Sequence, residues 1–405
     1  ILRQWSSLHP EFIFLPRKFK IAVTGAPVDR AAIQFHDIGY QVKRNDKGAL
    51  GFAVYIGGGM GRTPMLGKKI RDFLPEADLL AYSEAILRVY NMHGRRDNKF
   101  KARIKILVHE AGMENIAEQV EAEFEANRGG VLSLPEEEVR RIAAYFAPPD
   151  YEERPAASAA LERARRTDPA FDLWVRNNLS PHRMPGYGIV TISLKPTGGV
   201  PGDATADQLD AVADITERYS HGEVRVSHEQ NLVLPHVALD EVKDVYDALV
   251  AARLANANAG LITDIICCPG LDYCSLANAR SIPVAERISE RFADAHRQEE
   301  IGALKIKISG CINACGHHHA GHIGILGVDR KGEEFYQITL GGSGDETASI
   351  GEIVGKGFST DEIVDAVETL VDTYVATRES TGETFLETYR RVGPAPFKEA
   401  LYGAA

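Results

Sequence analysis

The 405-residue sequence has no cysteine outside one short stretch. All five cysteines lie between Cys267 and Cys315, and the rest of the chain has none. A disulfide framework spreads cysteines along the chain that it staples, whereas a metal site gathers them. The distribution therefore predicts a metal site in this stretch and argues against a disulfide scaffold.

Two further scarcities narrow the class of protein. Basic residues are outnumbered, with 46 Lys and Arg against 57 Asp and Glu, and the formal net charge is -11. Binding to nucleic acid depends on neutralising phosphates with basic side chains, so we expect no nucleic-acid partner. No apolar run approaches the length that crosses a bilayer, so we expect no membrane association and a cytoplasmic protein.

Self-comparison finds an internal repeat. Three stretches recur in the same order, each 284 or 285 positions further on, and they read as a strand ending at glycine, a strand running into two glycines, and an amphipathic helix. This order and constant spacing predict a duplicated domain. The matching pairs are 19–25 with 304–310, 57–58 with 341–342, and 79–90 with 363–374.

The second copy follows a region that the first copy lacks. This region, 183–256, reads as strand, helix, strand and helix, with strands at 188–194 and 224–234 and helices at 206–219 and 239–255. The repeat offset would place its counterpart before residue 1, so we expect roughly a hundred residues to precede this sequence in the natural protein.

Between the copies, the chain is rich in proline, alanine and charge, which is typical of a connection between domains. We therefore expect four parts. They are 1–128, the rest of the first repeat; 129–182, a linker; 183–256, a half-domain; and 257–405, the domain with the cysteines.

Four of the cysteines form two pairs, Cys268 with Cys274 and Cys311 with Cys315, spaced C-x5-C and C-x3-C. Zinc sites favour tighter C-x2-C or C-x4-C spacings, whereas an iron-sulfur cluster accepts thiolates from wider loops. The spacing favours iron-sulfur over zinc. Cys267 is expected to pack in the interior, because neighbours on an extended chain point in opposite directions.

Several histidines crowd the second cysteine pair and leave a mixed zinc site open as an alternative. They are His317, His318, His319 and His322.

The segments 268–279 (Cys-Pro-Gly-Leu-Asp-Tyr-Cys-Ser-Leu-Ala-Asn-Ala) and 308–316 (Ile-Ser-Gly-Cys-Ile-Asn-Ala-Cys-Gly) resemble the signatures of the sulfite/nitrite reductase hemoprotein family. The resemblance implies a mixed α+β protein with a pseudo-two-fold duplicated fold, a ferredoxin-like half-domain and two related α/β cofactor domains. It also implies that Cys315 bridges the cluster to the iron of a siroheme. The implied ligands of a 4Fe-4S cluster are Cys268, Cys274, Cys311 and Cys315.

The same resemblance assigns an anion site. Residues 15–23 read as an alternating strand that places Lys18 and Lys20 on one face, and in the family this stretch supplies two lysines to the substrate. Arg103 and Lys105 lie in a basic run that resembles a segment near the siroheme carboxylates. Two arginines that the family uses on the same anion have no counterpart here, which puts the activity of this chain alone in doubt.

The resemblance implies six-electron reduction of sulfite to sulfide, because the first cysteine motif is closer to the sulfite-reductase form. Reduction of nitrite to ammonia is the nearest alternative, and a non-enzymatic zinc or redox protein is the alternative from a different class. The expected electron donor is ferredoxin or a flavoprotein subunit that takes electrons from NADPH.

Overall fold

The structure is a computed structural model that describes residues 1–403. It divides into two compact units. Unit 1 comprises residues 1–148 and 343–350, and unit 2 comprises residues 149–342 and the described residues from 351 onward. In the described part of the chain, every helix is too short or too polar to cross a membrane.

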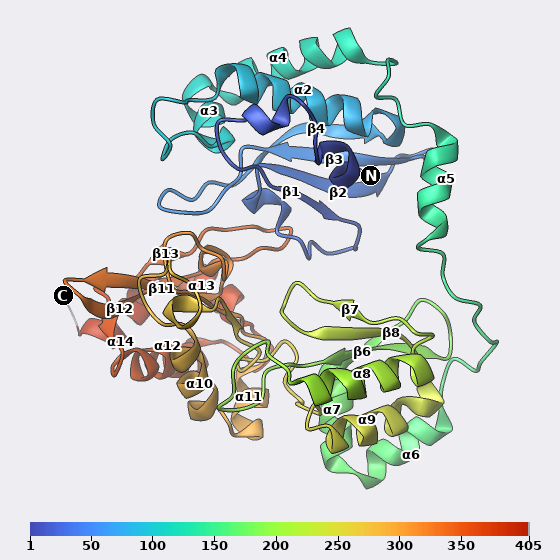
Figure 1. Cartoon of the computed structure of the whole chain (residues 1–405). Coiled ribbons are helices and arrows are strands. Elements are labelled where there is room, and N and C mark those ends of the chain that lie inside the picture. The colour runs from blue at the N-terminus through green and yellow to red at the C-terminus, as the bar shows by residue number, and fades with distance from the viewer. Residues whose placement is uncertain (404–405) are drawn as a thin grey trace. The chain divides into compact units, whose positions relative to one another are not determined.

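Unit 1 contains the first copy, built on a four-stranded mixed sheet with the strand order β1-β2-β3-β4. The strands β1 and β2 are parallel, and β3 and β4 run antiparallel to their neighbours. Helices α2, α3 and α4 pack against this sheet, as Figure 1 shows, and bury its apolar core. The elements are α1 (Leu2–Ser6), η1 (Phe12–Phe14), β1 (Ile21–Thr24), η2 (Ile33–Phe35), β2 (Ile38–Arg44), β3 (Leu50–Ile56), β4 (Lys68–Pro75), η3 (Glu76–Asp78), α2 (Leu79–His93), α3 (Ile104–Ala111), α4 (Met113–Asn127) and α5 (Glu136–Ala144).

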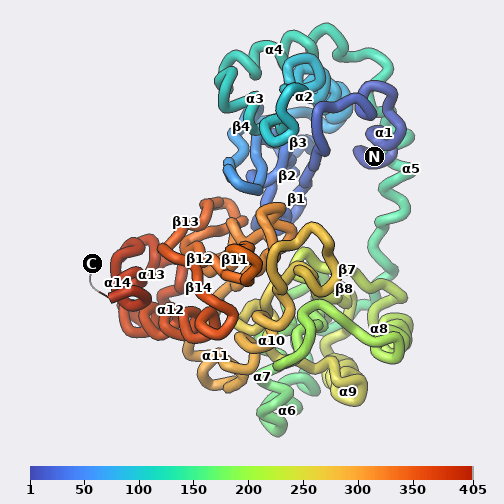
Figure 2. Tube along the Cα trace, turned by 60° about the vertical axis from the view of Figure 1, so that its left-hand side comes forward, coloured from blue at the N-terminus to red at the C-terminus, as the bar shows by residue number. Residues whose placement is uncertain are grey.

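Unit 2 contains the second copy, whose sheet has the order β13-β12-β11-β10-β9, with β14 also paired to β12. Helices α10 and α12 pack together, and Figure 2 shows α12 beside α14. The elements are β9 (Ile266–Cys267), η5 (Gly270–Asp272), α10 (Ile282–Arg291), α11 (Ala295–Ile301), β10 (Ile306–Ser309), η6 (His318–Ala320), β11 (Ile323–Arg330), β12 (Glu333–Leu340), β13 (Glu352–Ile353), β14 (Phe358–Ser359), α12 (Ile363–Thr377), α13 (Phe385–Val392) and α14 (Ala395–Tyr402).

The strand registers confirm the predicted duplication. Ile21 pairs with Ile38 in the parallel ladder of the first copy, and Ile306 pairs with Ile323 in that of the second, so both partners move by the same 285 positions. Helices α2 and α12 have equal length and begin 284 positions apart. Strand pairings and helices that recur at a nearly constant spacing indicate a repeated structural unit.

The half-domain lies within unit 2 and forms a third sheet, with the order β5-β6-β8-β7. Helices α6, α7, α8 and α9 contribute buried side chains to its separate core. The elements are α6 (Ala159–Thr167), α7 (Pro169–Asn178), β5 (Leu179–Pro181), β6 (Tyr187–Ile192), α8 (Ala206–Tyr219), β7 (Arg225–Val226), β8 (Leu232–Ala238), η4 (Leu239–Glu241) and α9 (Val242–Ala251).

Three segments differ from the sequence-based expectation. The strand expected over 224–234 is the hairpin of β7 and β8, because the Ser227 hydroxyl accepts the N–H groups of Glu229 and Asn231 and closes a turn. The strand expected over 15–23 begins only at Ile21. The segment 129–182, expected as a linker, holds α5, α6 and α7, and Trp174 is fully buried in the half-domain core.

Candidate metal centre

The two cysteine pairs follow neighbouring parallel strands. Strand β9 ends at Cys267 and β10 ends at Ser309, and the two strands pair in parallel with Cys267 opposite Ile308. Carboxyl ends of adjacent parallel strands lie at the same edge of a sheet, which is where open α/β sheets place their ligands. The fold therefore brings the Cys268 loop and the Cys311 loop to one edge.

Gly310 joins the two loops. Its N–H donates to the Cys268 Sγ at 3.1 Å, and its carbonyl accepts the N–H groups of Asn278 and Ala279 at 2.8 and 3.0 Å. A Cβ on Gly310 would stand 2.6 Å from the Ala279 carbonyl oxygen, so only glycine permits this approach. This hydrogen bond from the Gly310 N–H would also stabilise the negative charge of the Cys268 sulfur as a ligand of iron.

The cysteines differ in their environment. Cys311 is buried, Cys268 and Cys274 are half-buried, and Cys315 is exposed. Cys267 lies in the core of the second copy, as expected, and burial raises the pKa of its thiol well above the usual value. Because metals bind the thiolate, Cys267 is unsuited to ligation and the other four remain as candidates.

The half-domain holds β9 in place through Gln230. The Gln230 side chain accepts the Cys267 N–H at 3.0 Å and donates to the Cys267 carbonyl at 2.9 Å, as a neighbouring strand would. A buried ion pair between Lys195 and Asp264, 2.8 Å long, ties the half-domain to the turn before β9. Sequence reasoning missed Gln230, since no spacing pattern links it to a residue 37 positions away.

Two of the four histidines that follow the cysteine pair are buried. His318 is fully buried and His319 is 7% exposed. Among the described residues, neither ring nitrogen of His318 has a hydrogen-bond partner, and burial lowers the pKa of its imidazole to about 3. Within residues 1–403, no three His, Cys, Asp or Glu side chains are arranged to hold a single metal ion.

The residues present fit a cluster with thiolate ligands. Four cysteines from two loops at one edge supply the soft sulfur donors that iron-sulfur clusters take. Glycine at the junction lets the backbone approach the sulfurs, and an orphaned buried imidazole lies in the same loop as Cys311 and Cys315.

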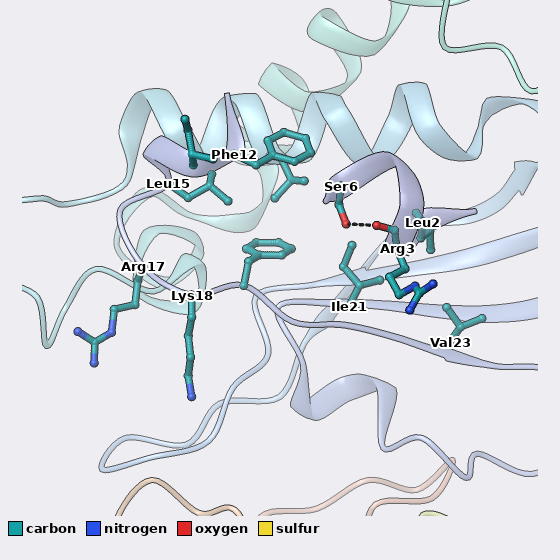
Figure 3. Close-up of a pocket in the computed structure, with 12 residues that line it drawn as sticks. Leu2, Arg3, Ser6, Phe12, Leu15, Arg17, Lys18, Ile21 and Val23 are labelled. Atoms are coloured by element: carbon teal, nitrogen blue, oxygen red, sulfur yellow. Dashed lines mark hydrogen bonds between the residues drawn. The ribbon is translucent and has the colours of Figure 1, made fainter. Parts of the chain in front are cut away.

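The anion-site candidates lie in unit 1. Lys18 is exposed and Lys20 is half-buried, and both precede β1 rather than lying within it. The stretch leaves the sheet because the Lys20 N–H bonds to the Asp37 carboxylate, at 2.9 Å, instead of to a strand. Lys18 lines a cavity of about 670 Å³, in which Figure 3 shows Arg17 and Lys18 extending away from Phe12 and Leu15.

Arg103 and Lys105 bond to groups of the same unit. Arg103 pairs through two nitrogens with the fully buried Asp37, at 2.6 and 2.9 Å. The Lys105 ammonium donates to the carbonyls of Met60 and Thr63 at 2.7 and 2.5 Å, and burial lowers the pKa of Lys105 to about 8. Their assignment to siroheme stays a prediction.

The fold and this site define a duplicated α/β protein whose second copy carries two cysteine pairs on neighbouring loops. The chain belongs to the family described as the nitrite and sulphite reductase 4Fe-4S domain, whose model matches residues 1–128 and 259–403. A second model, the nitrite/sulfite reductase ferredoxin-like half domain, matches residues 182–252. The 4Fe-4S cluster and the siroheme expected from the sequence are the cofactors of this family.

Curated relatives include both kinds of reductase. The chain is 24% identical to a sulfite reductase [ferredoxin] of Mycolicibacterium paratuberculosis and 26% identical to an assimilatory ferredoxin-dependent nitrite reductase of Haloferax mediterranei, covering 93% and 94% of this chain. It is 28% identical to a sulfite reductase [NADPH] hemoprotein beta-component of Acidithiobacillus ferrooxidans over 93% of this chain. The chain spans 62%, 62% and 61% of the length of these relatives.

A solved structure supports the fold. The NirA protein of Mycobacterium tuberculosis superimposes with a TM-score of 0.71 over 96% of this chain and 65% of its own, at 22% sequence identity. The expected mixed α/β fold with a duplicated core and a ferredoxin-like half-domain is thereby confirmed.

Proposed function

We propose that this chain forms the cofactor centre of an enzyme that reduces sulfite to sulfide with six electrons. The observation that carries the proposal is the meeting of the two cysteine-bearing loops at Gly310, whose N–H donates to the Cys268 sulfur. Family membership supplies the chemistry, because siroheme and a 4Fe-4S cluster together pass electrons singly to a small bound anion.

Within this proposal, Cys268, Cys274, Cys311 and Cys315 hold the cluster, and Cys315 also ligates the siroheme iron. The contrast between a buried Cys311 and an exposed Cys315 supports this division, since a shared thiolate needs an open side for the second cofactor. Gln230 fixes the backbone directly before Cys268 and so keeps the first cysteine loop in position.

Four cations of unit 1 complete the proposal. Lys18 and Lys20 attract the sulfite anion and help supply the protons with which the sulfite oxygens leave as water. Cationic donors are suited to this role. The exposed Lys18 at a cavity is open to such an anion. Arg103 and Lys105 are assigned to the carboxylates of siroheme, with Asp37 holding the Arg103 guanidinium in a fixed orientation.

Nitrite is the second candidate substrate. Curated relatives of similar identity act on either anion according to their names, and both reductions need six electrons. Ferredoxin or a flavoprotein subunit is proposed as the electron donor on the same basis, and a cytoplasmic location belongs to the same proposal.

Turnover with a reduced viologen donor tests the choice of substrate. We expect the purified protein, with both cofactors bound, to show a higher kcat/KM for sulfite than for nitrite. Lys18→Ala and Lys20→Ala should each lower kcat/KM at least tenfold, since each removes a charge from the anion site. A higher kcat/KM for nitrite would overturn the preference for sulfite, and unchanged kinetics in both lysine variants would overturn the anion site.

A further inference from the structure

The duplication allows the cysteine loop to be compared with a loop of the same shape that has no cysteine. The turn η2 begins at Ile33 and η6 begins at His318, 285 positions later. Each turn precedes the strand that pairs in parallel with β1 or with β10. The residue before each turn has a positive φ, 47° at Ala32 and 57° at His317. The two loops therefore share one backbone path.

His318 and Ile33 occupy the same buried position. Ile33 is 3% exposed and His318 is fully buried, and the carbonyl of each packs against the glycine of the following strand, Gly39 or Gly324. The first copy shows that an apolar side chain satisfies this position. The fold alone gives no reason for an imidazole there.

An imidazole at this position is costly without a partner. Burying a polar group that makes no hydrogen bond destabilises a protein, and buried polar groups in native proteins are almost always bonded. Among the described residues, neither ring nitrogen of His318 has a partner. A group outside the chain that accepts or donates a hydrogen bond would remove this cost.

The loop itself indicates which group that is. Cys311 and Cys315 stand where the first copy has Ala26 and Arg30, so the cysteines and His318 are replaced together in the copy without a metal centre. Because burial holds the pKa of His318 near 3, the imidazole is neutral and one ring nitrogen carries a proton that it can donate.

We propose that His318 donates a hydrogen bond to an anionic acceptor of the cofactors bound at the cysteine loops. This inference rests on the proposed cofactor binding. Two acceptors share the chemistry, a sulfur of the cluster and a carboxylate of siroheme. Such a bond stabilises the more negative, reduced state of the centre and so raises its reduction potential.

The substitution His318→Ile installs the residue of the first copy and tests the inference in the protein with both cofactors bound. We expect the variant to fold and to bind the cofactors, with a more negative midpoint potential. A change in the electron paramagnetic resonance signal of the reduced cluster identifies the sulfur acceptor, and a shift of the siroheme absorption band identifies the carboxylate. The same swap at the exposed His296 of α11, His296→Ile, should change neither signal.

Stability of the cofactor-free protein separates this role from a structural one. His318→Ile should raise the free energy of unfolding of the cofactor-free protein, because the orphaned imidazole is gone. An unchanged potential and unchanged spectra in the loaded variant would overturn the inference. Failure of the unsubstituted protein to bind iron and siroheme would instead overturn the proposed function, and the two failures are therefore distinguishable.

Discussion

After β1, the first copy runs from Gly25 through a loop without cysteine. After β10, the second copy places Cys311 directly after Gly310, and Cys315 follows in the same loop. Both strands then lead to a turn and a parallel partner at the same register. The edge strand β1 has one neighbour, while β10 also pairs with β9, which carries the first cysteine loop. The framework is thus shared, and the second copy adds the loops that can hold a metal centre.

The comparison separates residues needed for the fold from residues needed for the site. Cys311 replaces Ala26 and His318 replaces Ile33 in the second copy. In the first copy, Lys105 of α3 stands where α13 has the buried Leu386, since both helices have eight residues and begin at 104 and 385. At these positions one copy shows that a small or apolar residue is compatible with the shared fold.

The largest expected effect comes from replacing a cysteine of the second copy by the residue that the first copy has at the same position. Cys311→Ala should remove most of the iron and labile sulfide, because a 4Fe-4S cluster that loses one thiolate is no longer held. Iron analysis and the visible spectrum measure this loss. Cys267→Ala is the matched control and should keep its iron while losing about 1 kcal/mol of stability through a small cavity. Equal iron loss in both variants would contradict the assignment.

Breaking the buried ion pair of the first copy should have the next largest effect. Asp37→Ala leaves Arg103 without its partner in a buried setting, and we expect the free energy of unfolding to fall by about 3 kcal/mol. Denaturant unfolding measures it. The exposed Lys69–Asp72 pair provides the control, and Asp72→Ala should leave the denaturant unfolding curve nearly unchanged.

Loosening β9 should have a smaller effect. Gln230→Ala removes two hydrogen bonds to Cys267. We expect the free energy of unfolding to fall by about 2 kcal/mol and iron to be released faster to a chelator. Gln230→Glu keeps an oxygen that can accept the Cys267 N–H, but its ionised carboxylate cannot donate to the Cys267 carbonyl. Its loss of the hydrogen bond to that carbonyl should therefore be at least as large as in Gln230→Ala. Iron release at the unsubstituted rate in both variants would show that Gln230 does not position the loop.

The smallest effect concerns pH. The pKa of Lys105 in the folded state, about 8, lies below its usual 10.5, so the unfolded state binds the extra proton between these values. Stability should therefore rise as pH increases from 8 to 10.5, and this contribution is absent below pH 8. Lys105→Leu, which copies Leu386, should flatten the rise. An unfolding curve with the same slope in both proteins would argue against a depressed pKa.

Periodicity predicted the regular elements well where the local signal was strong. Helix α8 has the predicted bounds, 206–219, and the repeat was visible because strand and helix signals recur at one spacing. The helices α6 and α7 were missed inside a proline-rich segment. Their signals were the capping residues Ser158 and Asp168, whose side chains accept N–H groups of the first turn.

The site was predictable only in part. Spacing and resemblance selected the cysteines, and the parallel pairing of β9 and β10 explains how two distant pairs come to one edge. The contributions of Gln230 and Asp37 depend on contacts between elements far apart in sequence, for which no local pattern exists. The assignments of Lys18, Lys20, Arg103 and Lys105 stay predictions.

The most direct test of the metal centre is the composition of the purified, anaerobically prepared protein. Iron, acid-labile sulfide and siroheme are measured together with zinc on the same sample. We expect iron and labile sulfide in the amounts that a 4Fe-4S cluster requires, together with siroheme and no zinc. Zinc bound by the cysteines, with no labile sulfide, would contradict this expectation.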